Sequence, residues 1–363
     1  MKVLIVNPIL YTNENRNIKK VNTIKDTMIY DLCLAFKKKG CDVTLAASDL
    51  YKPSEKENYP FGVIWLRTKC TKLFPPNSLP YCPEVTKIAK SGNFDLIITS
   101  EVFSLNSLKL ALCTPKNLIV WHELAKHNNI FHGLASKFWY GVIAKICFKK
   151  ATVVARSVQA RNFISKYCKN VSDMVIDHGV NIEKFTPCKE KDNQFAISSQ
   201  LITRKHIEKS IEAFAKYLNK YDDSAKLYIM GDGDEKENLQ KLAKDLGADK
   251  NIIFTGKLSH NELIKILKKS IAMLVYTEKD NNMVSIVESL ALATPVITTD
   301  VPYNASYIKG ERLGIVDNNW NEDDLNELKK NDEYINNCLN YRKYLPTEYK
   351  AEQFLKIFSG EIK

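Results

Sequence analysis

The most constraining feature of this chain is an apolar strand followed by a polar loop, a short helix and another strand. Residues 271–276 are six apolar residues in a row, a run too short for most helices and typical of a strand buried on both faces. Ser285 predicts the start of a helix, which Thr294-Pro295 ends before a strand at residues 296–299. This order predicts a parallel α/β unit with a functional loop at the carboxyl end of a strand.

Two acidic residues, Asp280 and Glu288, flank the start of that helix. Free N–H groups and the positive end of the helix dipole attract phosphate at such a place. A carboxylate repels phosphate, so the two acids fit the site if they accept hydrogen bonds from neutral hydroxyls, such as those of ribose and a hexose. The pattern therefore favours a sugar nucleotide. A loop acid and a helix-surface acid that bind nothing are the alternative.

Length and composition predict a folded protein with room for two domains. The chain has 363 residues, 45% hydrophobic and 26% charged, and no apolar run approaches the length of a membrane span. Residues 1–8 are too short and too soon interrupted for a signal peptide. The nine cysteines are scattered, without the close pairs of metal or redox motifs. We therefore expect a cytoplasmic protein.

The charge is unevenly distributed along the chain. Residues 1–190 hold 28 Lys and Arg against 15 Asp and Glu, a net charge of +13, whereas residues 191–363 hold 25 against 27, a net charge of −2. The front half should favour an anionic partner such as phospholipid or a phosphorylated glycan. No nucleic-acid-binding motif accompanies the charge, so we expect no nucleic acid. A lysine-rich surface that serves solubility alone is the alternative.

The front half alternates strands and helices. The expected strands are residues 2–6, 42–47, 62–66, 94–99, 117–122 and 151–155. Thr23 predicts the start of a long helix that ends at Gly40, and Ser157 predicts the cap of another. Residues 133–150 mix Phe138 and Trp139 with lysines, as an interfacial helix on an anionic membrane would. A core-facing helix has the same ingredients.

His122 is the candidate catalytic residue of this half. It follows a buried strand at the sheet edge where functional groups gather, and imidazole can bond a sugar hydroxyl or carry a proton. A structural histidine is the alternative. The spacing between His122 and His127 is one residue too long for a zinc-binding helix, so we expect no metal site.

The back half predicts a second α/β domain. Residues 188–194 are the best linker candidate, and the loop at residues 200–206 follows a new strand at 195–199. Lys205 in that loop lies beside a helix start, where a cation and the helix dipole together suit a diphosphate. Further strands are expected at residues 226–230 and 251–256, and helices at 324–340 and 348–358.

Taken together, these motifs resemble the family 4 glycosyltransferases of the GT-B fold over nearly the whole chain. The segments that carry the resemblance are residues 178–187, Lys205, Gly231-Asp-Gly233, Phe254-Thr-Gly256, and residues 280–295, which are similar to the family's E-x7-E motif.

The resemblance implies two Rossmann-like, doubly wound domains facing a cleft. Residues 1–187 would form the acceptor domain, to which a helix at 346–363 returns, and residues 188–345 the nucleotide-sugar domain. The implied activity is sugar transfer from a nucleotide sugar to a glycan or lipid-linked acceptor, in cell-surface polysaccharide or glycoconjugate synthesis. Anomeric configuration would be retained, without metal or any cofactor beyond the donor substrate. The protein would lie in the cytoplasm, at the inner face of the plasma membrane if it is peripheral.

The resemblance also implies roles for single residues. Glu288 would hold the ribose, Asp280 the hydroxyls of the donor sugar and Lys205 the diphosphate, while His122 would lie near the anomeric centre; His122, Lys205 and Asp280 form the catalytic set. The residues expected to contact substrate are Gln200, Arg204, Lys205, Gly233, Lys257, Asp280, Met283, Val284, Ser285 and Glu288.

The chain departs from the family pattern at two of these positions. Asp280 stands where the family usually has Glu, and Gln200, which cannot neutralise a phosphate, stands where it usually has Arg. Lys205 and Arg204 would then carry more of the leaving-group charge. An inactive glycan-binding or scaffold subunit and a nucleotide-sugar epimerase of the same fold are the alternative functions.

Overall fold

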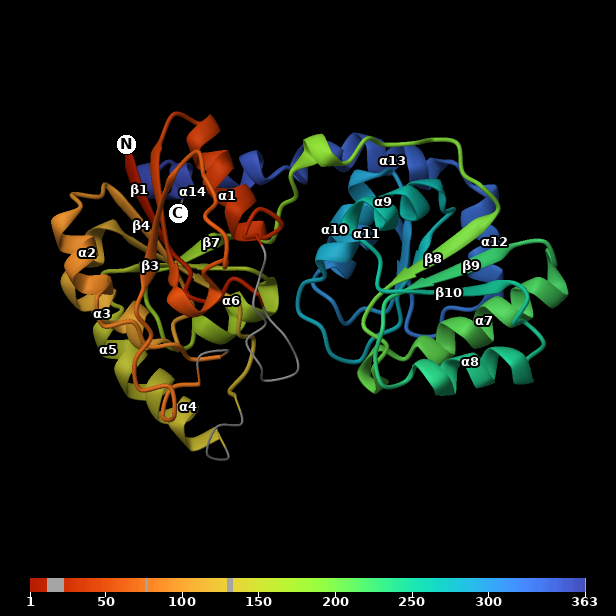
Figure 1. Ribbon diagram of the computed structural model, residues 1–363, viewed down its shortest axis with the longest axis horizontal. Helices are drawn as coiled ribbons and strands as arrows, with labels where there is room; N and C mark the ends of the chain where they lie inside the picture. Colours follow the sequence, from red (N-terminus) through yellow and green to blue (C-terminus); the bar gives the residue numbers. More distant parts are fainter. Residues whose placement is uncertain (12–22, 76–77, 129–132, 363) are drawn as a thin grey trace. The chain divides into compact units, whose positions relative to one another are not determined.

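The computed structural model describes residues 1–11, 23–75, 78–128 and 133–362. The chain forms two compact units, unit 1 with Met1–Gly179 and Thr347–Lys363, and unit 2 with Val180–Pro346 (Figure 1). The boundary lies earlier than the residue 187 expected from sequence. The reason is local: the Val180 N–H donates to the Leu345 carbonyl at 3.0 Å, and Phe185 is buried in the core of unit 2.

The described residues of unit 1 form a seven-stranded sheet with the order β3-β2-β1-β4-β5-β6-β7, in which these pairings are parallel. All six strands expected from sequence are present. The seventh, β7, has the sequence Val-Ser-Asp-Met-Val at the sheet edge, where polar residues break the apolar run that would have predicted it. The strands are β1 (Lys2–Val6), β2 (Asp42–Ser48), β3 (Gly62–Leu66), β4 (Leu96–Ser100), β5 (Leu118–His122), β6 (Thr152–Ala155) and β7 (Val171–Val175).

Helices cover both faces of this sheet, because alternate residues of its strands point to opposite sides and both sets are apolar. Val3 and Ile5 of β1 pack with α1 and α14, whereas Leu4 and Val6 pack with α2, α3 and α6. The last helix, α14, therefore belongs to unit 1. The helices are α1 (Met28–Lys38), α2 (Val85–Ser91), α3 (Leu105–Cys113), α4 (Leu134–Phe138), a π-helix (Trp139–Ala144), α5 (Lys145–Cys147), α6 (Val158–Ile164) and α14 (Thr347–Ser359).

The helix starts in unit 1 test two of the capping predictions. Ser157 caps α6 as expected, because its side chain accepts a hydrogen bond from the Ala160 N–H at 3.0 Å. The prediction that Thr23 opens α1 is wrong. The helix starts at Met28, and the buried Thr27 accepts from the Tyr30 N–H at 3.2 Å, so the cap is the threonine that the fold buries.

Unit 2 holds a six-stranded parallel sheet with the order β10-β9-β8-β11-β12-β13. One face packs on α7, α8 and α12, and the other on α9, α10, α11 and α13. The strands are β8 (Gln194–Ser198), β9 (Lys226–Met230), β10 (Ile252–Gly256), β11 (Met273–Leu274), β12 (Val296–Thr298) and β13 (Gly314–Val316). The helices are α7 (Ile207–Lys220), α8 (Lys236–Asp245), α9 (His260–Lys269), α10 (Val284–Ala291), α11 (Asn304–Gly310), α12 (Glu322–Lys330) and α13 (Glu333–Tyr341).

Two local predictions for unit 2 are corrected. Ser285 does not cap α10, which starts at Val284. Met283 is the extended residue before it, and its N–H donates to the buried Asn304 Oδ1 at 2.7 Å. The single helix expected at 324–340 is two helices, α12 and α13, because the Asn331 backbone is extended and ends the first.

Candidate functional site

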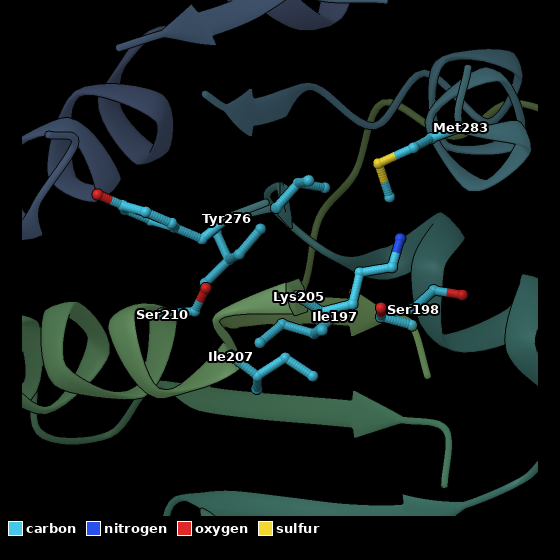
Figure 2. Close-up of a pocket in the computed structure, with 10 residues that line it drawn as sticks. Ile197, Ser198, Lys205, Ile207, Ser210, Tyr276 and Met283 are labelled. Atoms are coloured by element: carbon cyan, nitrogen blue, oxygen red, sulfur yellow. The ribbon is translucent and has the colours of Figure 1, made fainter. Parts of the chain in front are cut away.

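The strand order of unit 2 reverses between β8 and β11, and a pocket lies at the carboxyl ends of these two strands. Such a topological switch point is where parallel α/β sheets bind ligands. Ser198 ends β8, Lys205 lies in the turn just before α7, Ile207 begins that helix, and Tyr276 and Met283 follow β11. Figure 2 shows the Lys205 side chain extending towards Met283 in this switch-point pocket.

The loop that carries Lys205 is held by the glycine-rich turn after β9. The Leu201 N–H donates to the Asp232 carbonyl and the Leu201 carbonyl accepts from Glu235, both at 3.0 Å. A Cβ on Gly233 would lie 2.3 Å from the Leu201 carbonyl oxygen, and one on Gly231 would lie 1.8 Å from that of Ser199. Only glycine allows this approach, so Gly233 has a packing role, and its contact with substrate stays a prediction.

Asp280 binds two cations of this loop, Arg204 and Lys205. Its Oδ2 accepts from Lys205 Nζ at 2.7 Å and from Thr277 Oγ1 at 2.6 Å, and its Oδ1 accepts from the Arg204 guanidinium at 3.0 Å. Burial opposes ionisation of the carboxyl, but the Lys205 charge and these hydrogen bonds outweigh it and lower the pKa of Asp280.

This cluster carries two positive charges against one negative. The structure brings Arg204, Lys205 and Asp280 together, whereas the sequence assigned Asp280 to sugar hydroxyls and Lys205 to the diphosphate. Both carboxylate oxygens hold cations in place. The arrangement fixes Lys205 at the start of α7, where cation and helix dipole attract the same anion.

The other predicted substrate contacts of unit 2 spread along the sheet edge. Val284 and Ser285 form the first turn of α10, whose N–H groups have no intrahelical acceptor. Glu288 lies deeper in the helix, with Oε1 at 3.0 Å from His260 Nε2. Gln200 is exposed, and Lys257 is exposed after β10, which β9 separates from β8.

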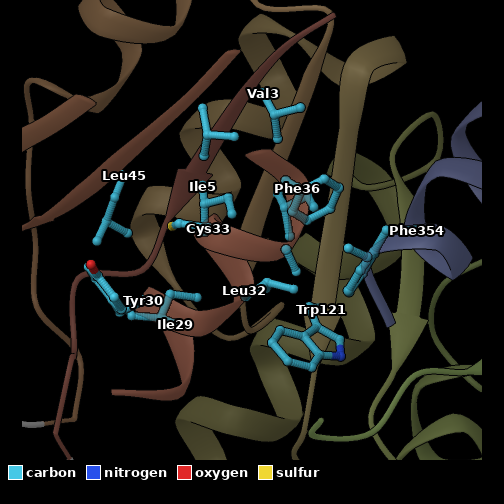
Figure 3. Packing of buried hydrophobic residues seen from close by; sticks show 14 of the residues in the cluster. Val3, Ile5, Ile29, Tyr30, Leu32, Cys33, Phe36, Leu45, Trp121 and Phe354 are labelled. Carbon is cyan, nitrogen blue, oxygen red and sulfur yellow. The ribbon is translucent and has the colours of Figure 1, made fainter. Parts of the chain in front are cut away.

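His122 ends β5 in unit 1 and is fully buried. The strand is fixed by its neighbour Trp121, whose indole packs edge-on against Phe354 of α14 at 5.4 Å between ring centres (Figure 3). His122 Nδ1 lies 2.9 Å from Glu101 Oε2, without the alignment of a linear hydrogen bond. Its Nε2 is buried with no hydrogen-bond partner among the residues that the structure describes.

Glu101, which sequence reasoning missed, is the partner of His122. Its backbone has a positive φ of 65°, a conformation that costs roughly 1 to 3 kcal/mol for a non-glycine residue and is often found at functional sites. Its Oε1 accepts from the Glu123 N–H at 2.7 Å. Burial opposes ionisation, but His122 and then Arg156 lower the pKa of Glu101. Its position directly after the buried strand β4 was the signal that could have found it.

Arg156, which sequence reasoning also missed, completes the ionic cluster at this edge. Its guanidinium lies 3.9 Å from the Trp121 ring and donates to Glu123 at 2.9 Å. His178 is buried nearby with its ring against Trp121, and burial, followed by the charges of Arg156 and Lys350, lowers its pKa well below the ordinary value. Lys350 is in turn paired with Asp177.

The described part of the chain contains no group of three or more His, Cys, Asp or Glu placed to hold a metal ion. Among its helices, none combines the length and the apolar character that crossing a bilayer requires.

Comparisons with known proteins match this architecture. The family Glycosyl transferases group 1 matches residues 181–341, and Glycosyltransferase Family 4 matches residues 26–184. The chain is 26% identical over 255 residues to an alpha-monoglucosyldiacylglycerol synthase of Streptococcus pneumoniae, across 63% of this chain and 57% of that protein. It is 30% identical over 171 residues to the O-antigen chain mannosyltransferase RfbU of Salmonella typhimurium, across 46% and 47%. The chain thus spans about half the length of these relatives.

The fold agrees with that of a solved structure along almost the whole chain. Anabaena Alr3699/HepE in complex with UDP and glucose superposes with a TM-score of 0.64 at 12% identity, across 99% of this chain and 100% of that one. The two family matches together cover residues 26–341. With two parallel α/β units in the GT-B fold, this chain belongs to the family 4, group 1 glycosyltransferases.

Proposed function

We propose that this protein is a retaining glycosyltransferase that moves a sugar from a nucleotide-sugar donor to a glycan or lipid-linked acceptor. The observation that carries the proposal is the pair of cations, Arg204 and Lys205, held by Asp280 beside the switch-point pocket. Two fixed cations at a helix start suit the diphosphate of a nucleotide sugar. The names of the relatives support sugar transfer to lipid or polysaccharide acceptors, and the HepE complex supports a uridine nucleotide.

The chemistry that this site suits is stabilisation of a leaving group. As the bond between the anomeric carbon and the diphosphate oxygen breaks, negative charge grows on the diphosphate, and Lys205 and the α7 dipole stabilise it. The acceptor hydroxyl oxygen then bonds to the anomeric carbon on the same face of the sugar, and its proton passes to the departing diphosphate oxygen. Asp280 keeps the Lys205 ammonium in place. For His122, whose ring and Nε2 are buried, we propose a position near the anomeric centre.

We further propose that the reaction needs no metal, because Arg204 and Lys205 supply the positive charge that a divalent cation would otherwise bring to the diphosphate. The reaction would serve cell-surface polysaccharide or glycoconjugate synthesis. We place the enzyme in the cytoplasm, at the anionic inner face of the plasma membrane, on the strength of the basic unit 1. That unit holds 29 Lys and Arg against 16 Asp and Glu.

A panel of nucleotide sugars tests the proposal. The purified protein is incubated with each donor, with and without a chelator, and both released nucleoside diphosphate and altered donor are measured. A transferase or slow hydrolase releases nucleotide, at the same rate with the chelator present. Release that stops on chelation and returns with Mg²⁺ would contradict metal independence.

The same panel separates the alternative functions. An epimerase returns a changed donor without net release of nucleotide. An inactive scaffold does neither, an outcome that the neutral Gln200 would then explain. Thermal shift with each nucleotide reports binding independently, because a ligand of the folded state raises its stability by mass action.

A further inference from the structure

One helical segment of unit 1 exposes a row of large apolar side chains. The segment joins α4, the π-helix and α5. Every fourth residue of it is apolar and exposed: Leu134, Phe138, Val142 and Ile146, at 67%, 62%, 42% and 59%. We call these four residues the exposed apolar row. Exposed apolar residues occur singly on most proteins, so a row of four along one helical segment indicates an interaction surface.

The π-helix explains why the row is continuous. A residue every four positions drifts around an α-helix of 3.6 residues per turn, whereas the wider turn of a π-helix offsets that drift. The buried residues Ser136, Tyr140, Ala144 and Phe148 follow the same four-residue spacing on another face. Trp139, expected from sequence at an interface, instead donates its indole N–H to the Val102 carbonyl at 2.9 Å, so it anchors the segment to the core of unit 1.

Positive charge surrounds the exposed apolar row. Lys137 and Lys145 are exposed on this segment, and Lys149 and Lys150 are exposed directly after it. None of the four forms an ion pair within the described ranges. The sequence from residue 124 to residue 172 holds nine Lys and Arg and no Asp or Glu. The positive charge along this stretch is therefore not balanced locally by carboxylates from the same stretch.

We propose that the exposed apolar row and its four lysines dock unit 1 on an anionic lipid bilayer. An anionic bilayer offers a partner for the apolar side chains and for the lysines, because acyl chains take up the former and lipid phosphates bind the latter. A soluble anionic glycan would satisfy the lysines and leave Phe138 and Ile146 in water. The inference rests on the proposed function at one point: the proposed function places the enzyme at a membrane, and the inference names the surface that binds there.

Sedimentation of the full chain with lipid vesicles tests the docking. Vesicles of phosphatidylcholine alone are compared with vesicles in which about one third of the lipid is phosphatidylglycerol, at low and high salt. We expect binding to the anionic vesicles only, weakened by salt. One variant changes the four lysines together to Gln, and the other combines Phe138→Ser with Ile146→Ser. Each should lower the partition coefficient onto the anionic vesicles by at least about tenfold.

Matched variants in unit 2 serve as controls. Lys216, Lys241, Lys244 and Lys250 are four exposed lysines of that unit, and their joint change to Gln removes the same charge elsewhere. Leu246→Ser removes an exposed leucine in the same way. Both controls should sediment like the unchanged protein. Because every substituted side chain is exposed, the thermal unfolding midpoint should stay unchanged, which confirms that each variant is folded.

The outcomes separate this inference from the proposed function. Nucleotide-induced thermal shift, measured on the same samples, reports the site in unit 2 and should not respond to the unit 1 variants. Nucleotide binding without vesicle binding would overturn the docking alone. Vesicle binding that ignores lipid charge, or that the unit 2 controls weaken equally, would also overturn it. Binding to immobilised heparin but not to vesicles would assign the lysines to a soluble anion and end the membrane inference.

Discussion

The carboxyl edges of the two sheets carry ionisable clusters of opposite construction. In unit 1, Glu101 in a strained backbone conformation lies against the fully buried His122. In unit 2, two cations share the single carboxylate of Asp280, and the Arg204 side chain keeps a third of its surface exposed. The first cluster places a partly exposed acid beside a buried histidine ring, whereas the second gives one carboxylate two cations and so carries net positive charge.

The difference shows what each edge is suited to do. Burial and strain restrict the His122 ring to one orientation, which suits a group that must contact one particular atom. The net positive charge of the unit 2 cluster suits an anion that arrives from water, because charge attracts the anion at a distance and the helix dipole adds to that attraction. Removing a residue from the unit 1 cluster should therefore affect a different step of the reaction than removing one from the unit 2 cluster.

The largest effect is expected for Lys205→Ala. Loss of the ammonium removes charge stabilisation that grows as the diphosphate leaves, so turnover should fall on the order of a hundredfold while KM changes less. Steady-state kinetics with the best donor of the panel measure it. Lys209→Ala, on the exposed side of α7 and paired with Glu212, is the control and should be near normal. Equal turnover in both variants would remove Lys205 from the mechanism.

A smaller effect is expected for Glu101→Gln. The amide keeps the shape of the side chain but loses the negative charge beside His122 Nδ1, so the ring is held less firmly, and kcat should fall about tenfold. Nucleotide binding in unit 2 should be unchanged, since the two clusters belong to separate units. The exposed Glu55→Gln is the control. A rise in KM with unchanged kcat would contradict the positioning role.

The smallest effect concerns the pH dependence of stability. His206 lies 2.7 Å from Glu208 and 2.9 Å from Glu278, and the hydrogen bond with Glu208, assisted by Glu278, outweighs burial and raises its pKa. A raised pKa in the folded state means that the protonated ring stabilises the fold. This stability is fully present below about pH 6.5, the ordinary pKa of histidine, and is lost as the pH rises through the raised value.

The variant His206→Asn tests this, because Asn tolerates the left-handed backbone at φ 41°. Thermal unfolding midpoints between about pH 6 and about pH 8 should fall less steeply in the variant than in the unchanged protein. Glu278→Gln should give part of the same flattening. Identical pH profiles for all three proteins would show that the ring does not titrate in this way.

Much of the fold follows from local pattern. Residues 3–6 and 96–98 are apolar runs too short for helices within the strands expected at 2–6 and 94–99, and strands that are apolar on both faces need helices on both sides. That argument predicts two parallel α/β units from the sequence. It fails for β7, because the edge strand is half exposed and its polar residues hide it.

The candidate site could be predicted in part. Lys205 and Asp280 were identified from their places beside helix starts, which is local information. That Asp280 holds Lys205 and Arg204 was not, because the residues lie 75 and 76 positions apart and meet only when β8 and β11 pair. Glu101 and His122 meet for the same reason, through the pairing of β4 with β5.

Local sequence predicts most of the strands, the two α/β units and the placement of the cations beside helix starts, because these depend on neighbouring residues. Only the tertiary structure decided which side chains are partners and which face water. Residues 134–148 are the clearest case, since apolar residues there occur on every side and the π-helix removes the 3.6-residue period that marks a buried face. Packing against the sheet of unit 1 buried Tyr140 and Phe148 and left Phe138 and Ile146 outside.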